Sequence, residues 1–174
     1  MSPEILFQTQ LVLGYVAWLL CFGAYIWPRL KAMNHFEAQR AIATLHSFRF
    51  FGLVFILPGV VGPNLPVSFA TFAAYWDFAT GLLAMLALFT VRIRPLFWLF
   101  VVAFNLVGCV DLILDYYHAT QIGLPAKAGE LGAAYAIPII YVPLLIITHI
   151  VAFYFLLHRQ PKAAPTHARD LAAS

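Results

Sequence analysis

Charged side chains are scarce in this chain. Asp, Glu, Lys and Arg together make up 10% of its 174 residues, whereas a soluble globular domain carries about 25%. Apolar residues account for 63% of the sequence, and the mean hydropathy is +0.88. This composition excludes an ordinary soluble domain and predicts an all-α integral membrane protein, with the lipid bilayer as its solvent.

Several motifs of known chemistry are also missing. The two cysteines, Cys21 and Cys109, lie in separate hydrophobic runs, so they predict neither a disulfide framework nor a CxxC metal site. The sequence has no Ser-His-Asp spacing, glycine-rich phosphate loop or HExxH motif, and no lysine inside a predicted span. Serine hydrolase, nucleotide-binding and zincin functions therefore have no motif behind them, and a retinal Schiff base is excluded. The basic residues form no stripe, which argues against a nucleic-acid partner.

Five hydrophobic runs are long enough to cross the ~30 Å hydrocarbon core as helices. They cover about 5–27, 41–61, 67–91, 96–117 and 136–157. Pro28 is expected to end the first helix, because proline lacks the amide donor. Residues 1–157 are therefore predicted to form a bundle of five transmembrane helices. The charged, proline-broken segment 158–174 has little apolar surface and is predicted to be a disordered cytoplasmic tail.

The basic residues predict an orientation. All but two of the ten lie in the first-to-second connection, the third-to-fourth connection and the tail: Arg29, Lys31, Arg40, Arg92, Arg94, Arg159, Lys162 and Arg169. The segments on the opposite side contain only Lys127. Since cytoplasmic loops carry the excess of Lys and Arg, the N-terminus is predicted to lie outside and the C-terminus in the cytoplasm.

The fourth run carries a line of ionisable groups. Asp111, Asp115 and His118 are spaced i, i+4, i+7, so they share one face of a helix. A charge in hydrocarbon costs at least ~2.5 kcal/mol, so such residues usually face a partner or a wet cavity. We expect Asp111 to lie roughly 10 Å below the outer surface, at 1.5 Å per residue. Asp115 and His118 are expected near that surface, where water would solvate them.

Other runs bring ionisable groups to similar depths. Asp77 lies roughly 15 Å down, Arg49 and His149 roughly 20 Å and His46 roughly 24 Å by the same helical rise. His46, Arg49 and Leu53 would share one face of an α-helix. Because an isolated buried charge is costly, Arg49 is expected to pair with Asp77 or Asp111. The sequence therefore predicts a bundle-interior ligand-binding site made of Arg49, Asp77, Asp111 and His149.

Three functions fit these residues. The first is a polar cavity that binds or transports a small polar or anionic ligand, or protons. The second is a b-type haem as cofactor, held by His46 and His149 from two helices within roughly 5 Å of depth. The third is a metal-dependent membrane enzyme using Asp77, Asp111 and His149, although the charge of Arg49 would repel a cation. The same polar groups could also act only as hydrogen bonds between helices. No feature predicts an oligomeric state.

A pattern of short motifs runs from about residue 49 to residue 157. It comprises Arg49–Gly52, Leu65-Pro66 with Phe69-Ala70, Asp77 with Gly81-Leu82-Leu83-Ala84, Asn105–Gly108 with Asp111-Leu112, Ile137-Pro138, Pro143-Leu144-Leu145 and His149. This pattern resembles small multi-pass bacterial integral membrane proteins of unassigned function. The chain departs from it at Tyr75-Trp76, where the pattern has small residues and glycine. The resemblance implies a bacterial inner-membrane setting and no particular activity.

Overall fold

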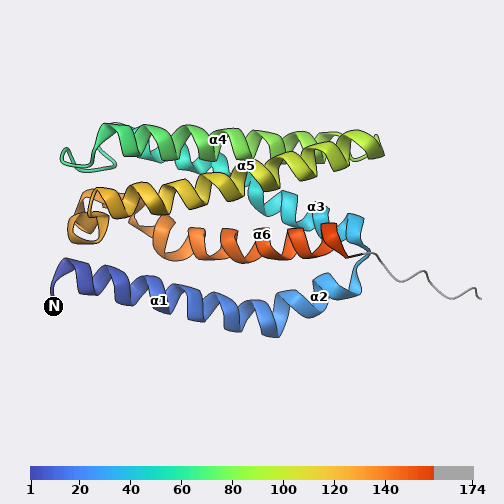
Figure 1. Ribbon diagram of the computed structural model, residues 1–174, viewed down its shortest axis with the longest axis horizontal. Coiled ribbons are helices and arrows are strands. Elements are labelled where there is room, and N and C mark those ends of the chain that lie inside the picture. Colours follow the sequence, from blue (N-terminus) through green and yellow to red (C-terminus); the bar gives the residue numbers. More distant parts are fainter. Residues whose placement is uncertain (159–174) are drawn as a thin grey trace, which may run out of the picture.

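The computed structural model describes residues 1–158, so the predicted tail lies outside the described residues from 159 onward. Long helices lie side by side along a common direction, and the described part contains no strand (Figure 1). In chain order the elements are α1 (Pro3–Cys21), η1 (Phe22–Ile26), α2 (Trp27–Ala32), α3 (His35–His46), η2 (Ser47–Ile56), α4 (Val67–Phe89), α5 (Arg94–Gln121), η3 (Leu124–Tyr135), η4 (Ile137–Tyr141) and α6 (Val142–Leu157). The predicted all-α fold is confirmed.

Four helices in the described residues are long and apolar enough to cross a membrane, where the sequence predicted five. They span Pro3–Ala32, Val67–Phe89, Arg94–Gln121 and Ile137–Leu157. The predicted second span, 41–61, is wrong as a single apolar helix. The chain there forms α3, which carries polar residues such as Gln39 and Arg40, and then tightens into the 3₁₀ helix η2. Together α3 and η2 run back along the bundle, antiparallel to α1 and α4 (Figure 1).

Proline shapes two of the long helices without ending them. Pro28 was predicted to end the first helix, but the helix continues to Ala32. A π-helical turn, η1, precedes Pro28, and the backbone N–H of Trp27 bonds to the carbonyl of Phe22. The wider turn absorbs the break that the missing proline donor makes in the α-helical ladder. The turn η4 precedes Pro143 in the same way.

The turn η4 gives α1 a docking point. The indole N–H of Trp18 donates to the carbonyl oxygen of Ile140 at 2.7 Å. One turn earlier, Gly14 faces the carbonyl of Ile139, and a Cβ there would clash with the oxygen. Pro143 cannot donate to Ile139, its i−4 carbonyl, so that group is free of the usual helical bond. Small residues allow such close backbone approach in membrane bundles.

The core divides into two apolar clusters. Between them lies a layer of buried polar residues, called the polar layer below: His46, Arg49, Asp77, Asn105, Asp111 and His149. One cluster surrounds Phe97, Val101, Phe104 and Ala152. The other surrounds Phe55, Phe69, Leu131 and Ile137, toward the end of the bundle that contains the N-terminus. Many large apolar side chains remain exposed on the outside of the helices, including Leu13, Leu20, Leu106, Ile113 and Ile150. Because soluble monomers rarely expose such a surface, this exterior is that of a protein surrounded by lipid.

Candidate functional site

The 3₁₀ helix η2 positions the central residue of the polar layer. Arg49, Gly52 and Phe55 are its buried residues, and they follow the buried His46 at intervals of three. A 3₁₀ helix has three residues per turn, so these positions line one face. The predicted α-helical face continued at Leu53, which was wrong: Leu53 is only partly buried, and Gly52 takes the inward place. The difference follows from the helix type.

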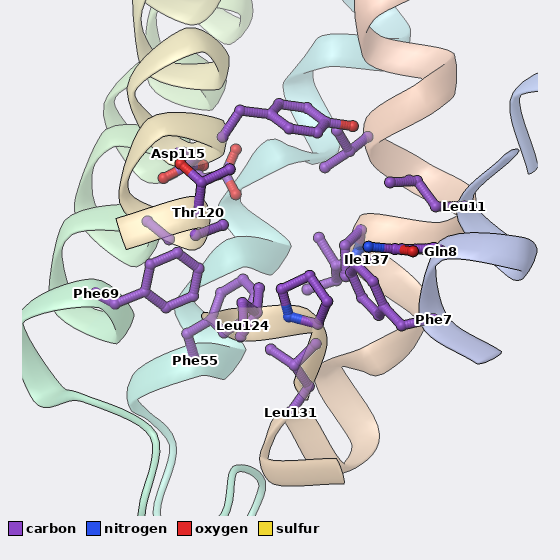
Figure 2. A pocket seen from close by; sticks show the side chains of 17 residues that line it. Phe7, Gln8, Leu11, Phe55, Phe69, Asp115, Thr120, Leu124, Leu131 and Ile137 are labelled. Carbon is purple, nitrogen blue, oxygen red and sulfur yellow. The ribbon is translucent and has the colours of Figure 1, made fainter. Parts of the chain in front are cut away.

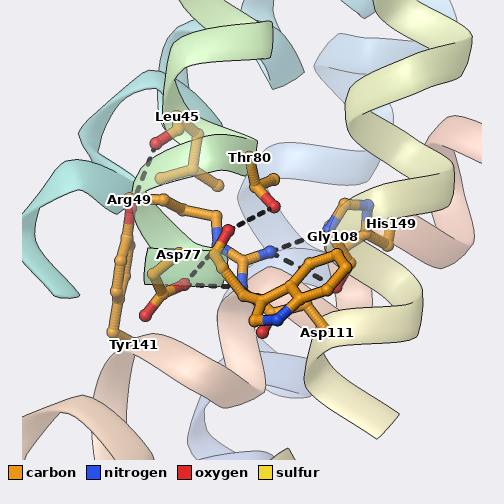
Figure 3. Close-up of polar contacts among 9 residues, drawn as sticks. Leu45, Arg49, Asp77, Thr80, Gly108, Asp111, Tyr141 and His149 are labelled. Atoms are coloured by element: carbon orange, nitrogen blue, oxygen red, sulfur yellow. Dashed lines mark hydrogen bonds and ion pairs between the residues drawn. The ribbon is translucent and has the colours of Figure 1, made fainter. Parts of the chain in front are cut away.

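Arg49 is completely buried, and each nitrogen of its guanidinium has a protein partner (Figure 3). Nε donates to Asp77 Oδ1 at 2.6 Å, and Nη2 lies 2.5 Å from the same oxygen. Nη2 also donates to Asp111 Oδ2. Nη1 donates to the carbonyl oxygen of Gly108 at 3.3 Å and lies 3.4 Å from His149 Nε2. The guanidinium therefore has no nitrogen left over for an incoming ligand.

Arg49, Asp77 and Asp111 form an ion cluster, and three glycines let the helices pack closely around it. A Cβ on Gly108 would lie 2.6 Å from Arg49 Nη1 and 2.7 Å from His149 Nε2. A Cβ on Gly52 would lie 2.5 Å from the Cβ of Asp77, and one on Gly81 would lie 2.8 Å from the backbone nitrogen of Phe50. Real Cβ atoms do not approach other atoms so closely. Glycine at these positions therefore lets η2, α4 and α5 approach one another.

The hydrogen bonds of His149 assign its tautomer. Arg49 has only donors, so His149 Nε2 can meet Nη1 only as an acceptor. The proton then lies on Nδ1, which donates to Asn105 Oδ1 at 2.9 Å. Asn105 is itself oriented, because its Nδ2 donates to the carbonyl of Val101 at 2.8 Å. Asn105 thus orients the imidazole through Nδ1, the ring nitrogen that does not meet Arg49, as a carbonyl or carboxylate does for many functional histidines.

His46 lies against His149, with the two rings tilted by 47°, and does not contact Arg49 directly. The ring centroids are 4.1 Å apart. The Thr148 hydroxyl donates to the Leu144 carbonyl at 2.8 Å, so it accepts from His46 Nε2 at 3.0 Å. A haem held by both histidines would place iron and the macrocycle between the rings. Rings in direct contact leave no room for this, so the predicted haem alternative does not fit this arrangement.

The metal alternative has no ligand cluster to support it in residues 1–158. Among these residues no group of three or more His, Cys, Asp or Glu side chains could hold a metal ion. Asp77, Asp111 and His149 are close in space, but all three are directed at Arg49. The cation that they surround is the guanidinium itself.

A cavity of about 240 Å³ lies beside the ion cluster, on the side of the N-terminal end of the bundle. Most of its wall is apolar, and the charged residues that line it are Asp77 and Asp115. Figure 2 shows Asp115 at one end and Leu131 at the other, with Phe7, Phe55 and Phe69 around the space between. Asp77 belongs to both sites, because one of its oxygens binds Arg49 while its side chain forms part of the cavity wall.

The structure brings together all four residues predicted as a ligand-binding site: Arg49, Asp77, Asp111 and His149. Sequence reasoning missed two others. Asp115 was expected to be solvated, but it lines the cavity, and its Oδ1 is buried without a hydrogen-bond partner. Its spacing of four residues from Asp111 was the available signal. Asn105 was missed as the partner of His149, although it lies in the same predicted span as Asp111, six residues earlier.

Comparison with known protein families adds one finding. The model of a domain of unknown function, DUF8737, matches residues 6–157. The chain belongs to this family. No curated protein matches the chain, and no solved structure does either. The matched region begins within α1, ends with α6, and includes the ion cluster and the residues that line the cavity.

Proposed function

We propose that this DUF8737 protein is a multi-pass protein of the bacterial inner membrane that binds a small molecule in the cavity beside Arg49. The ligand would have a largely apolar body and one polar or charged group. The bundle would cross the membrane five times, with the N-terminus periplasmic, the predicted tail cytoplasmic, and the α3–η2 pair as the additional crossing. The asymmetric distribution of Lys and Arg supports this orientation.

The observation that carries the proposal is the shared carboxylate of Asp77. It is 6% exposed, it binds Arg49 through one oxygen and it lines a cavity whose other charged residue is Asp115. An apolar cavity with a few convergent polar groups is the usual form of a small-molecule site. A ligand that contacts Asp77 would also change the charge balance around Arg49. Ligand binding in the cavity would therefore affect the ion cluster in the bundle interior.

The charges of the cavity oppose the anionic ligand predicted from the sequence. That prediction required Arg49 to face the ligand, but the side chain is 0% exposed and its nitrogens are occupied. Carboxylates line the cavity instead. Proton transport across the bundle finds less support than binding, because the apolar cluster around Phe97 and Phe104 closes the opposite side of the polar layer.

Filling the cavity tests the proposal. Ala119 lines the cavity from α5, and Ala119→Phe should occupy part of its volume. Ala103, on the same helix, is also half-buried but does not line the cavity, so Ala103→Phe is the matched control. Small molecules that co-purify with the protein in mild detergent are identified by mass spectrometry. We expect a compound retained by wild type and Ala103→Phe to be lost from Ala119→Phe. Equal retention by all three proteins would contradict the proposal.

A further inference from the structure

The cavity has more acid than base. Asp77 and Asp115 line it, and Asp111 lies one helical turn from Asp115. The charged groups that act on Asp115 from neighbouring elements are Asp77 on α4 and Arg49 on η2, whereas α1, η3, η4 and α6 contribute only uncharged residues to the cavity wall. The other titratable residue of the wall is Tyr116, whose hydroxyl is hydrogen-bonded to that of Tyr15. In the described residues every ion pair within 4 Å involves Arg49, and its partners are Asp77 and Asp111. Asp115 therefore has no cationic partner.

Two carboxylate oxygens lack a hydrogen-bond partner at this place. Asp115 Oδ1 is buried beside the cavity without a hydrogen-bond partner, and so is Asp111 Oδ1, one helical turn away. An ionised carboxylate without a partner is costly in a low-dielectric interior. A bound proton or a bound cation removes that cost for Asp115, and the cavity gives both access to its carboxylate. The two are therefore competitors.

We propose that the cavity takes a small organic monocation with an apolar body, and that the cation binds in exchange for a proton on Asp115. This inference rests on the proposed function and names its ligand class. In the exchange, the O–H bond of the Asp115 carboxyl breaks, the electron pair stays on the carboxylate oxygen, and the proton leaves through the cavity to water. The total charge of the site is the same before and after.

The cavity wall fits such a ligand. Phe7, Phe55 and Phe69 line the cavity between Asp115 and Leu131 (Figure 2). Aromatic faces attract organic cations, and the attraction is stronger when water is excluded. Arg49 disfavours cations in general, but the two carboxylates in direct contact with it outweigh its single positive charge. Asp115 adds a third carboxylate, on the cavity wall, so the side chains around the ligand carry a net negative charge when Asp115 is ionised.

The test uses purified full-length protein and three aromatic probes that differ in charge: benzyltrimethylammonium, benzyl alcohol and phenylacetate. Isothermal titration calorimetry in buffers of different ionisation enthalpy measures both the affinity and the number of protons released. We expect the ammonium probe to bind most tightly, to release close to one proton, and to bind more tightly as the pH rises, since fewer protons then compete. Phenylacetate should bind least.

Variants assign the effect to Asp115. Asp115→Asn should weaken binding of the ammonium probe about tenfold or more, as expected for loss of a desolvated charge, and should abolish proton release. Asp115→Glu keeps the carboxylate and should keep proton release, which guards against a folding defect in the amide variant. Glu4→Gln removes an exposed carboxylate at the same end of the bundle and should behave like wild type.

The outcomes separate the two proposals. The inference is overturned if the ammonium probe does not bind, binds without proton release, or binds Asp115→Asn as tightly as wild type. If benzyl alcohol still binds and Ala119→Phe abolishes that binding, the cavity remains a ligand site and only the ligand class is wrong. If all three probes fail and Ala119→Phe also retains every co-purified compound, the proposed function fails as well.

Discussion

Replacing Arg49 should expose how strongly the ion cluster holds the bundle together. Arg49→Met keeps much of the side-chain length but removes all contacts with Asp77, Asp111, Gly108 and His149. Two buried carboxylates are then left without their counter-ion. Breaking one side of a buried ion pair costs about 3–5 kcal/mol in soluble proteins, whereas single hydrogen bonds in membrane bundles average ~0.6 kcal/mol.

The geometry indicates a loss of the size expected for a broken buried ion pair and not of the size expected for a single hydrogen bond. Asp111 and Arg49 are both 0% exposed, and three nitrogens of one guanidinium lose their partners together. We therefore expect Arg49→Met to lower the free energy of unfolding by about 3 kcal/mol. Asp77→Asn and Asp111→Asn should each destabilise by a smaller amount, because one carboxylate still pairs with Arg49. The triple variant, with all three residues neutral, should recover more than half of the Arg49→Met loss.

The measurement is reversible unfolding in mixed detergent micelles, followed by circular dichroism. Arg92 is exposed in the connection between α4 and α5, so Arg92→Met is the matched control and should have little effect. Additive losses in the multiple variants would refute the reasoning, because residues that stabilise one another must show a coupling energy. A triple variant less stable than Arg49→Met would have the same meaning.

Two further predictions concern packing and topology. Gly108→Ala should destabilise the protein by about 1–3 kcal/mol, since its Cβ would lie 2.6 Å from Arg49 Nη1. Gly23→Ala is the control, because its Cβ meets nothing within 4 Å. Equal unfolding midpoints of the two variants would contradict the close packing at Gly108. Reporter fusions placed after Gly62, Arg94, Lys127 and the tail should be periplasmic, cytoplasmic, periplasmic and cytoplasmic in turn, as the charge asymmetry predicts. A periplasmic tail, or a Gly62 fusion on the same side as the Arg94 fusion, would contradict this topology of five crossings.

The sequence by itself determined which segments are apolar and where polar groups interrupt them. Hydrophobic length and charge depend only on local composition, so α4, α5 and the final helix from Ile137 to Leu157 agree closely with the predicted runs. The cost of a charge in lipid also marked Arg49, Asp77, Asp111 and His149 as residues that need partners. Their grouping was thus predictable without a structure, while their role in ligand binding stays a prediction.

Only the tertiary structure decided how these groups meet. Whether residues 47–56 form an α-helix or a 3₁₀ helix depends on packing against α4, because the two helix types differ little in local preference. The 3₁₀ helix places Gly52, and not Leu53, beside Asp77. The contact between His46 and His149 joins residues about a hundred positions apart, and no sequence period reports such a distance. The cavity beside Asp115 likewise exists because α1, α4, α5 and η3 leave a space between them, which is a property of their arrangement and not of any one segment.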